Sequence, residues 1–463
     1  MTRKHALMPL PLVMALALAL TGCASVGPDY QRPDIALPAG QQLPQVDARW
    51  WQSFGDSQLD ALIDEALRYN RDLRQAAARV DEAAAALGSA RASRLPQVTA
   101  NIGSARVQTS QYSSGAGALG TQHSAGLNAS WELDLWGKLA RQREAAAANL
   151  TASEYTLAAA RLSLAAQVSN AYFQLLAFDS QLAAAEATLK GREDSFRLRQ
   201  KRFNGGMTSE LELKQAEAEL ASAQAAVPKL SQAVKQSEHA LAVLLGRAPR
   251  ELLQTPVRGK PLDRLVEVPA IPADLPSDLL LRRPDIAAAE QQLIAANARI
   301  GVARAAYFPS IGLSAGIGSE SVKLAQLFSG PAQVWSFAGN LAAPIFNNGA
   351  IAADVSAASA RQQQALAGYE KVVQSAFADT LDALSAVRSS RDTELAQRKQ
   401  LDAMREALRL ARLRYDNGYS SYLEVLDAER SVFQLEQALA DARLTRLQAA
   451  VSLYTALGGG WRG

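Results

Sequence analysis

The sequence RFNGGMTSELEL at residues 202–213 recurs as RYDNGYSSYLEV at residues 414–425, 212 positions later and without a gap. The same shift places Leu245–Gly246 on Leu457–Gly458, so the correspondence extends over more than forty residues. A period of this length is too long for a solenoid repeat and indicates two copies of a whole substructure. We therefore expect each half of the chain to contain the same elements in the same order.

Both copies contain a very long segment that favours a helix. Residues 138–203 and 350–414 have no proline and are rich in alanine, with leucine, glutamine and arginine between. At about 1.5 Å of rise per residue, each could run roughly 100 Å as one helix. The stretches 204–206 and 416–418 tolerate left-handed backbone, which predicts that each long helix reverses there into an antiparallel partner. Pro228 predicts a kink in the first of these partners.

Segments ahead of each long helix have a side-chain period of two. Residues 125–135, 311–318 and 335–345 alternate apolar side chains with small or polar ones, which is typical of β-strands. Their length of about 9 to 11 residues suits a tilted strand that crosses a bilayer, although a soluble sandwich alternates in the same way. Four strands cannot close a barrel, and open sheet edges are not tolerated in lipid, so the membrane interpretation requires strands from several chains. Three chains would give twelve strands, but the pattern does not choose three over two or four.

These elements divide the chain into six segments. We expect a signal peptide, a lipidated N-terminal extension, a first repeat of helix, two strands and helical hairpin, a proline-rich linker, a second repeat and a short tail. In that order they occupy residues 1–22, 23–55, 56–246, 247–276, 277–458 and 459–463.

The N-terminus has the pattern of a secretory signal. A basic start at Arg3 and Lys4 precedes an apolar stretch from Ala6 to Leu20, and small residues lead to Cys23 as in a lipoprotein cleavage site. We expect Cys23 to become the lipidated first residue, the alternative being an incidental thiol near an ordinary cleavage site. By resemblance to bacterial lipoproteins, Ala24 in place of an aspartate predicts delivery to the outer membrane.

Composition excludes several classes of function. Cleavage of the signal would remove Arg3 and Lys4 and leave 46 of the 48 basic side chains against 45 acidic ones, a formal charge of +1. So balanced a charge does not indicate the basic surface that binds nucleic acid. Cys23 is the only cysteine, so no disulfide or thiolate metal site can form within one chain. His123 and His239 lie far apart without neighbouring ligands, and no phosphate loop or nucleophile elbow is present. We therefore predict that the protein is not an enzyme and binds no metal or cofactor.

Three further segments resemble the signatures of one family. They are WELDLWG at residues 131–137, LLLRRPDIAAAE at residues 279–290 and APIFNNG at residues 343–349. With the duplication, they resemble the TolC family of outer-membrane factors, and most closely its lipidated OprM and NodT type, over nearly the whole mature chain. The resemblance implies a mainly α protein with a transmembrane β-barrel part. A trimer would form a twelve-stranded barrel, a twelve-helix periplasmic tunnel and, from the linker and chain ends, an equatorial collar.

The same resemblance implies a function. The protein would be the outer-membrane exit duct of a tripartite efflux pump, carrying palmitate and working with a periplasmic membrane-fusion adaptor and an inner-membrane pump of the resistance-nodulation-division type. Its cargo would be drugs or other small molecules, as in antibiotic resistance. Type I secretion and metal efflux are alternatives within the channel class. A periplasmic coiled-coil scaffold lipoprotein is an alternative of another class, and it predicts no barrel.

The resemblance also indicates where a pore gate would lie. TolC-like channels close at the periplasmic end through helices whose acidic side chains ring the pore just past the second tip, and Glu424 and Asp427 match that segment. Three residues apart, they share a helix face, although an ordinary solvated face is the alternative. Crowded carboxylates around one axis resist closure and attract cations. Tyr415 matches a family tyrosine that helps to hold the tip closed, as a latch. The family's latch also uses an arginine, and Ser420 stands at that position here. This difference weakens the likeness to TolC itself.

The two turns resemble the tips through which such channels meet the hairpins of an adaptor. Their other role is to reverse the chain, and the two roles are compatible. The tip residues that we expect to contact the adaptor are Gly206, Met207, Thr208, Gly418, Tyr419 and Ser420.

Overall fold

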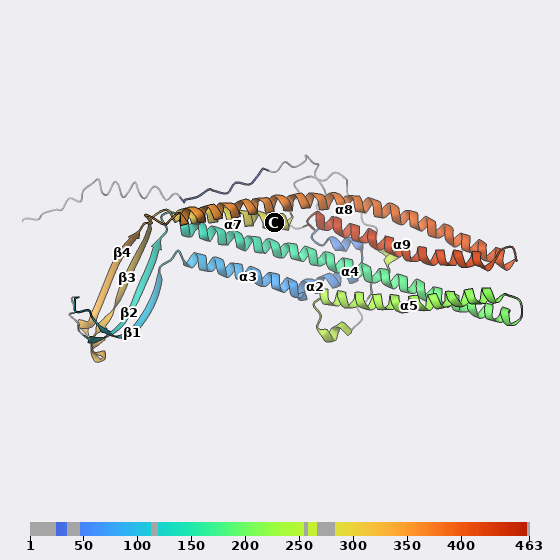
Figure 1. Cartoon of the computed structure of the whole chain (residues 1–463), viewed down its shortest axis with the longest axis horizontal. Coiled ribbons are helices and arrows are strands. Elements are labelled where there is room, and N and C mark those ends of the chain that lie inside the picture. Colours follow the sequence, from blue (N-terminus) through green and yellow to red (C-terminus); the bar gives the residue numbers. More distant parts are fainter. Residues whose placement is uncertain (1–24, 35–46, 113–118, 254–257, 266–282, 461–463) are drawn as a thin grey trace, which may run out of the picture. The chain divides into compact units, whose positions relative to one another are not determined.

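The computed structural model of the chain is shown in Figure 1. It describes residues 25–34, 47–112, 119–253, 258–265 and 283–460. They divide into two compact units, each considered by itself below. Unit 1 holds the described parts of Met1–Ile35, Arg79–Glu154 and Ala288–Glu370, and unit 2 those of Ala36–Ala78, Tyr155–Ala287 and Lys371–Gly463.

The elements repeat in the two halves of the chain. The first series is α3 (Arg71–Ala92), β1 (Gln97–Gln108), β2 (Leu119–Leu133), α4 (Lys138–Asn204) and α5 (Glu210–Leu244). The second series is α7 (Pro284–Ala305), β3 (Ser310–Ser321), β4 (Gln333–Ala342), α8 (Ala350–Asp416) and α9 (Tyr422–Ala456). The remaining elements are α2 (Ser57–Tyr69) and the short 3-10 turns η1 (Trp50–Phe54), η2 (Pro249–Leu253), η3 (Leu262–Arg264), η4 (Leu324–Gln326) and η5 (Gly330–Ala332).

The helix lengths confirm the duplication. α4 and α8 have 67 residues each, α5 and α9 have 35 each, and both pairs of bounds differ by the same 212 positions. The two hairpins, α4 with α5 and α8 with α9, therefore turn at equivalent residues. We call them the first and second hairpins.

Local sequence explains where the helices begin. The Asp134 carboxylate accepts hydrogen bonds from the N–H groups of Leu139 at 2.9 Å and Ala140 at 2.7 Å, which caps the start of α4. α5 continues through Pro228, and the kink expected there stays a prediction. In the described part of the chain, every helix falls short of the combined length and apolarity that crossing a membrane requires.

Unit 1 contains one antiparallel sheet with the strand order β1-β2-β3-β4 (Figure 1). β2 pairs with β3, opposing Leu127 to Ile317, so the strands of the two copies join in one sheet rather than in two separate hairpins. The expected alternation is confirmed, because Ile317 also opposes Trp335 on β4 and the apolar side chains share one face. β1 and β4 are the edge strands of this sheet.

β2 is longer than expected. It has 15 residues and starts at Leu119, whereas the alternation predicted a strand over residues 125–135. The reason is its pairing on both sides, since Leu119–Ser130 pairs with β1 and His123–Leu133 pairs with β3. Large apolar side chains such as Ile102 and Trp335 remain exposed on the protomer.

An extended segment, Ser25–Asp34, docks along α4 and α7 in unit 1. The N–H of Val26 donates to the Trp136 carbonyl at 3.0 Å, and Asn297 Nδ2 donates to the Pro28 carbonyl at 2.9 Å. Arg32 Nη2 and the Tyr30 hydroxyl both donate to Glu290, at 2.5 Å and 3.1 Å. We call Ser25–Asp34 the strap.

Unit 2 has the main hydrophobic core. The core brings aromatic side chains from η1, α4 and α9 together, with Phe54 and Phe173 in edge contact at 4.9 Å between ring centroids. Trp50 stacks on Tyr454 at 5.3 Å. Segments from near both ends of the chain thus meet in one core, whose burial stabilises the base of the hairpins.

A buried carboxylate secures the segment after η2 to this core. Asp56 accepts hydrogen bonds from the Tyr172 hydroxyl at 2.8 Å, the Gln58 N–H at 2.9 Å and the Lys260 N–H at 3.1 Å. Because the group is buried, these three donors replace the water that it loses on folding. The described part of the predicted linker is thereby held against α2 and α4.

Candidate functional site

Both hairpin tips close with the same backbone motif. Gly206 and Gly418 adopt left-handed backbone, with φ of 70° and 79°, as the sequence predicted. The N–H of Met207 donates to the Arg202 carbonyl at 2.8 Å, and the N–H of Tyr419 donates to the Arg414 carbonyl at 2.8 Å. These bonds satisfy carbonyls that the helix ends would leave free, so the sequence of each turn determines its geometry.

The tip side chains differ in how they are used locally. Met207 and Tyr419, at equivalent positions, are 73% and 78% exposed. Thr208 Oγ1 donates to Glu212 Oε2 at 2.5 Å and so supports the first turn of α5. Ser420 Oγ is buried without a hydrogen-bond partner among the described residues. Each tip thus presents one large apolar side chain to its surroundings.

The two predicted gate acids lie on one exposed face at the start of α9. Between them, Val425 and Leu426 turn inward into a small core, and the carboxylates point away from it. Glu424 is 3.6 Å from Arg414 across the turn, and Asp427 is 3.4 Å from Arg430. The side chains of the two acids are 47% and 63% exposed, so these ion pairs are weak and leave the carboxylates accessible.

Tyr415 connects the second hairpin to the first. Its hydroxyl donates to Glu212 Oε2 on α5 at 3.2 Å, and its ring lies 5.6 Å from that of Tyr422. Burial raises the pKa of the Tyr415 hydroxyl and Glu212 adds to this, while Arg199 opposes it. The hydroxyl therefore remains a donor at neutral pH.

Arg199 is a tip residue that sequence reasoning missed. It is buried on α4, with its guanidinium carbon 4.0 Å from the centroid of the Tyr422 ring and 4.9 Å from that of Tyr415. Such a cation over two rings ties the first hairpin to the second. The sequence contained one indication of this residue. The equivalent position in the second copy is Ala411, so the arginine occurs in one copy and not in the other.

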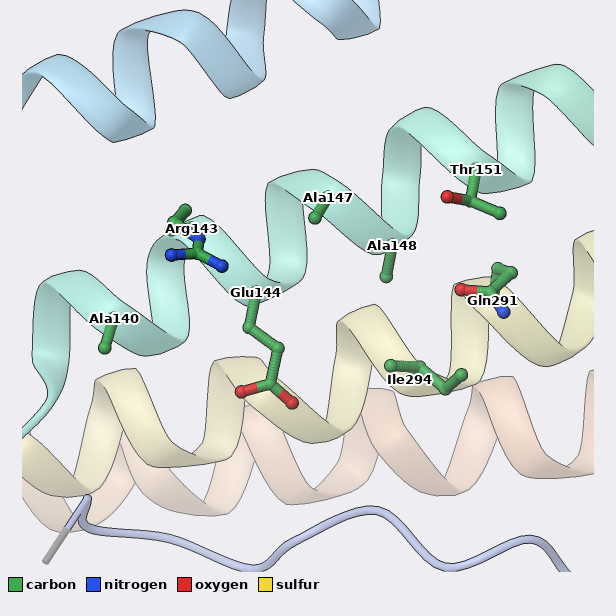
Figure 2. A pocket seen from close by; sticks show the side chains of 8 residues that line it. All are labelled: Ala140, Arg143, Glu144, Ala147, Ala148, Thr151, Gln291 and Ile294. Atoms are coloured by element: carbon green, nitrogen blue, oxygen red, sulfur yellow. The ribbon is translucent and has the colours of Figure 1, made fainter.

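A separate pocket in unit 1 lies between α4 and α7 (Figure 2). Its volume is about 420 Å³, and Ala147, Ala148 and Ile294 form much of its wall. Arg143 and Glu144 are the charged residues of the lining, and Glu144 is already paired with Arg141 at 2.8 Å. The lining consists mainly of small side chains that suit helix packing, rather than a set of catalytic groups. The predicted lipidation site, Cys23, lies outside the described residues.

Comparison with known proteins identifies the family. The model of the outer membrane efflux protein family matches the chain twice, over residues 62–247 and 275–459. The cation efflux system protein CusC of Escherichia coli O6:H1 is 40% identical, covering 97% of this chain and 98% of that protein. The toluene efflux pump outer membrane protein TtgC of Pseudomonas putida is 37% identical, covering 97% and 95%. The pyoverdine export outer membrane protein OpmQ of Pseudomonas aeruginosa is 38% identical, covering 92% and 90%.

Solved structures agree with this assignment. A crystal structure of CusC has a TM-score of 0.85 at 39% identity and covers 94% of this chain and all of that one. The open state of the Neisseria gonorrhoeae MtrE outer membrane channel has a TM-score of 0.83 at 37% identity, covering 94% and 98%. The mainly helical fold with a four-stranded sheet is thus that of the TolC-like outer-membrane channels. The chain belongs to the outer membrane efflux protein family, whose members are transport channels.

Proposed function

We propose that this outer-membrane efflux channel acts as a homotrimer, the exit duct of a tripartite pump that passes drugs or other small molecules. One observation carries the proposal: relatives named for cations, toluene and pyoverdine match the chain almost equally well, at 40%, 37% and 38% identity. Similar ducts of one family thus belong to pumps named for unlike cargoes, which supports a duct that leaves selection to its partners. Selection therefore belongs to the inner-membrane pump, of the resistance-nodulation-division type, and its periplasmic membrane-fusion adaptor.

The sheet supports assembly into a trimer. β1 and β4 are edge strands, and exposed backbone edges are not tolerated in lipid. Pairing β4 of one chain with β1 of the next would remove both edges, and three chains would give an even total of twelve strands. Trimer bands in unheated detergent gels, lost on boiling, test this assembly.

Cation efflux is the second candidate, because CusC, a cation efflux protein, matches 97% of the chain at 40% identity. The test is to express the chain, with an adaptor and a pump of the resistance-nodulation-division type, in a strain that lacks its own channels. Small-molecule efflux predicts lower accumulation of a dye and higher resistance to antibiotics, with tolerance to transition-metal salts unchanged. Metal tolerance alone would make cation efflux the function.

We assign the pore gate to Glu424 and Asp427, with Tyr415 as its latch. Support comes from their exposure beside the second tip and from the Tyr415 hydrogen bond to Glu212 on the other hairpin. Replacing both acids with alanine should lower the cation-to-anion permeability ratio in planar bilayers, because these carboxylates attract cations. Glu217→Ala removes an exposed acid of the first hairpin, which pairs with Lys214, and is the matched control. An unchanged ratio in the double variant would reject the gate.

We assign adaptor contact to the two tips. Exposed Met207 and Tyr419 are apolar side chains at the ends of two otherwise hydrophilic turns, as in a docking surface. Met207→Glu with Tyr419→Glu should abolish cross-linking to the adaptor and efflux, while the trimer band persists. Cross-linking at the wild-type level would show that the tips only reverse the chain.

We assign the lipid anchor to Cys23. The strap places Ser25, two residues after this cysteine, against the turn at Gly137, whose added Cβ would lie 3.0 Å from the Ser25 Cα. Labelled palmitate should enter the wild-type protein and not the Cys23→Ser variant. Equal labelling of both proteins would reject the assignment.

A further inference from the structure

A buried arginine on the first hairpin reaches across to the second. Arg192 on α4 is 6% exposed at its side chain. Its Nη1 lies 2.5 Å from Glu429 Oε2 on α9, and its Nη2 lies 3.3 Å from Glu219 Oε2 on α5. One guanidinium thus holds an acid of its own hairpin and an acid of the other.

Two further arginines complete this cluster, one across the junction between the hairpins and one within the second hairpin. Arg430 on α9 donates through Nε to Glu219 at 2.6 Å, and its side chain is 49% exposed. Arg412 on α8 donates to Glu429 at 2.7 Å, within the second hairpin. Removing Arg192 therefore leaves each acid with an arginine, so the loss weakens the junction between hairpins and not the fold of either one.

Burial makes the Arg192 contact the stronger tie. Exposed ion pairs are screened and contribute little, whereas breaking a desolvated pair costs much more. The side chains of Glu219 and Glu429 are 11% and 16% exposed, so Arg192 and its two partners are all largely removed from water. Of the two ion pairs by which this cluster joins the hairpins, the half-exposed Arg430 contact is the weaker.

The cluster is well placed to control the second tip. Arg192 precedes the end of α4 at Asn204 by 12 residues, roughly 18 Å along the helix. Its partner Glu429 follows Asp427 by two residues on the same continuous helix. Holding Glu429 therefore holds the segment that carries the proposed gate acids.

The duplication shows that the cluster serves the junction. The positions equivalent to Arg192 and Glu219 in the second copy are Met404 and Ser431. The second hairpin has nonetheless the same helix lengths and the same turn as the first. The charges are thus unnecessary for building a hairpin, and a role in joining two hairpins accounts for their presence in one copy.

We propose that Arg192 is a positioning residue that locks the second hairpin against the first and so sets how often the periplasmic tip opens. This inference rests on the proposed function, in which the channel opens and closes at this tip. Each hairpin is a pair of long helices joined by a tight turn, and the motion that we infer for the tip is movement of one hairpin relative to the other. The proposal takes the described arrangement as the closed one, so that the Arg192 contacts favour the closed population.

The test compares Arg192→Gln with Arg405→Gln in planar bilayers and in cells. Arg405 pairs with Glu436 at 2.7 Å within the second hairpin, so its replacement removes the same charge without touching the junction. Arg192→Gln should raise the open probability, and the uptake of a large antibiotic, about tenfold, the factor that about 1.4 kcal/mol of closed-state stabilisation represents. Arg405→Gln should behave as wild type. Arg192→Lys keeps the charge but loses the planar fork whose two nitrogens each reach one acid, so it should lie between.

A double-variant cycle identifies the contact. If Arg192 acts through Glu429, Glu429→Gln added to Arg192→Gln should produce less than the product of the two single effects. Trimer bands in detergent gels must match wild type, which excludes misassembly as the cause. Wild-type open probability in Arg192→Gln would overturn the proposal.

The readouts separate this inference from the gate assignment. The gate predicts a changed cation-to-anion permeability ratio when Glu424 and Asp427 are replaced, whereas the lock predicts a changed open probability when Arg192 is replaced. A changed open probability with an unaffected ratio in the acid variant would retain the lock and reject the acids as the gate. The converse result would retain the gate and reject the lock.

Discussion

Arg141 Nη2 on α4 donates to Asp29 Oδ1 at 2.6 Å, across 112 residues of sequence. The Arg141 side chain is 8% exposed while that of Asp29 is 88% exposed, so a buried cation reaches out to hold the strap. Gly27 and Gly301 complete the contact, because a Cβ on Gly27 would lie 2.5 Å from the Gly301 Cα. The strap is thus built into unit 1 and determines where the proposed lipid on Cys23 leaves the protein.

Replacing Arg141 with glutamine should release the strap. The variant loses the Asp29 ion pair, and we expect proteolysis within residues 25–34 to accelerate about tenfold, because cleavage follows local opening. Limited proteolysis of the purified protein in detergent measures this. Glu144→Gln removes only the neighbouring acid that pairs with Arg141, so it should leave the cleavage rate near that of wild type.

Replacing Gly301 with alanine separates the strap from its helix. Alanine favours a helix over glycine by about 1 kcal/mol, so α7 should not weaken. The new Cβ would meet the Val26 carbonyl at 2.6 Å, which should displace the strap. Hydrogen exchange should then accelerate at the Val26 N–H, which donates to the Trp136 carbonyl, and stay slow in α7. Slow exchange at Val26 would contradict the described packing.

Replacing Gly246 with alanine should destabilise unit 2. Gly246 has φ of 72°, and a Cβ there would collide with the Tyr69 carbonyl at the end of α2. We expect a loss of about 2 kcal/mol or more, since both the backbone conformation and the contact oppose a side chain. Thermal unfolding followed by circular dichroism measures it. Gly191→Ala, in mid-helix with open space around it, is the control and should be neutral or stabilising.

Glu394 should make stability depend on pH. Burial alone would raise its pKa, but the hydrogen bond and charge of Arg446, with the charges of Arg398 and Arg443, outweigh burial and hold the pKa below its usual 4.5. A carboxyl with a lowered folded-state pKa stabilises the protein above about pH 4.5, and that contribution is lost as the pH falls through the folded-state value.

The comparison is between melting temperatures of wild type and Glu394→Gln from pH 7 to pH 3. Wild type should be more stable at pH 7, and the difference should shrink below about pH 4.5. Glu406→Gln is the control, because Arg409 also lowers the pKa of Glu406 but that side chain is exposed and solvent screens the pair. A difference for Glu394→Gln that persists unchanged at pH 3 would contradict this account.

The sequence anticipated part of the candidate site. The turns at Gly206 and Gly418 and the shared face of Glu424 and Asp427 depend on residues within a few positions of one another, so local rules were sufficient. The partner of Tyr415 was not predictable in this way. Glu212 lies 203 residues away, and only the packing of one hairpin on the other brings the two side chains together.

By itself, the sequence determined the duplication, the two long helices and the alternating strands, because helix propensity, turn glycines and side-chain periodicity act over short stretches. Tertiary structure decided the pairing of β2 with β3, the docking of the strap on Arg141 and the reach of Arg192 to Glu429. These contacts join residues more than a hundred positions apart. Which buried charge meets which partner depends on how long helices lie against each other, and no local pattern records that.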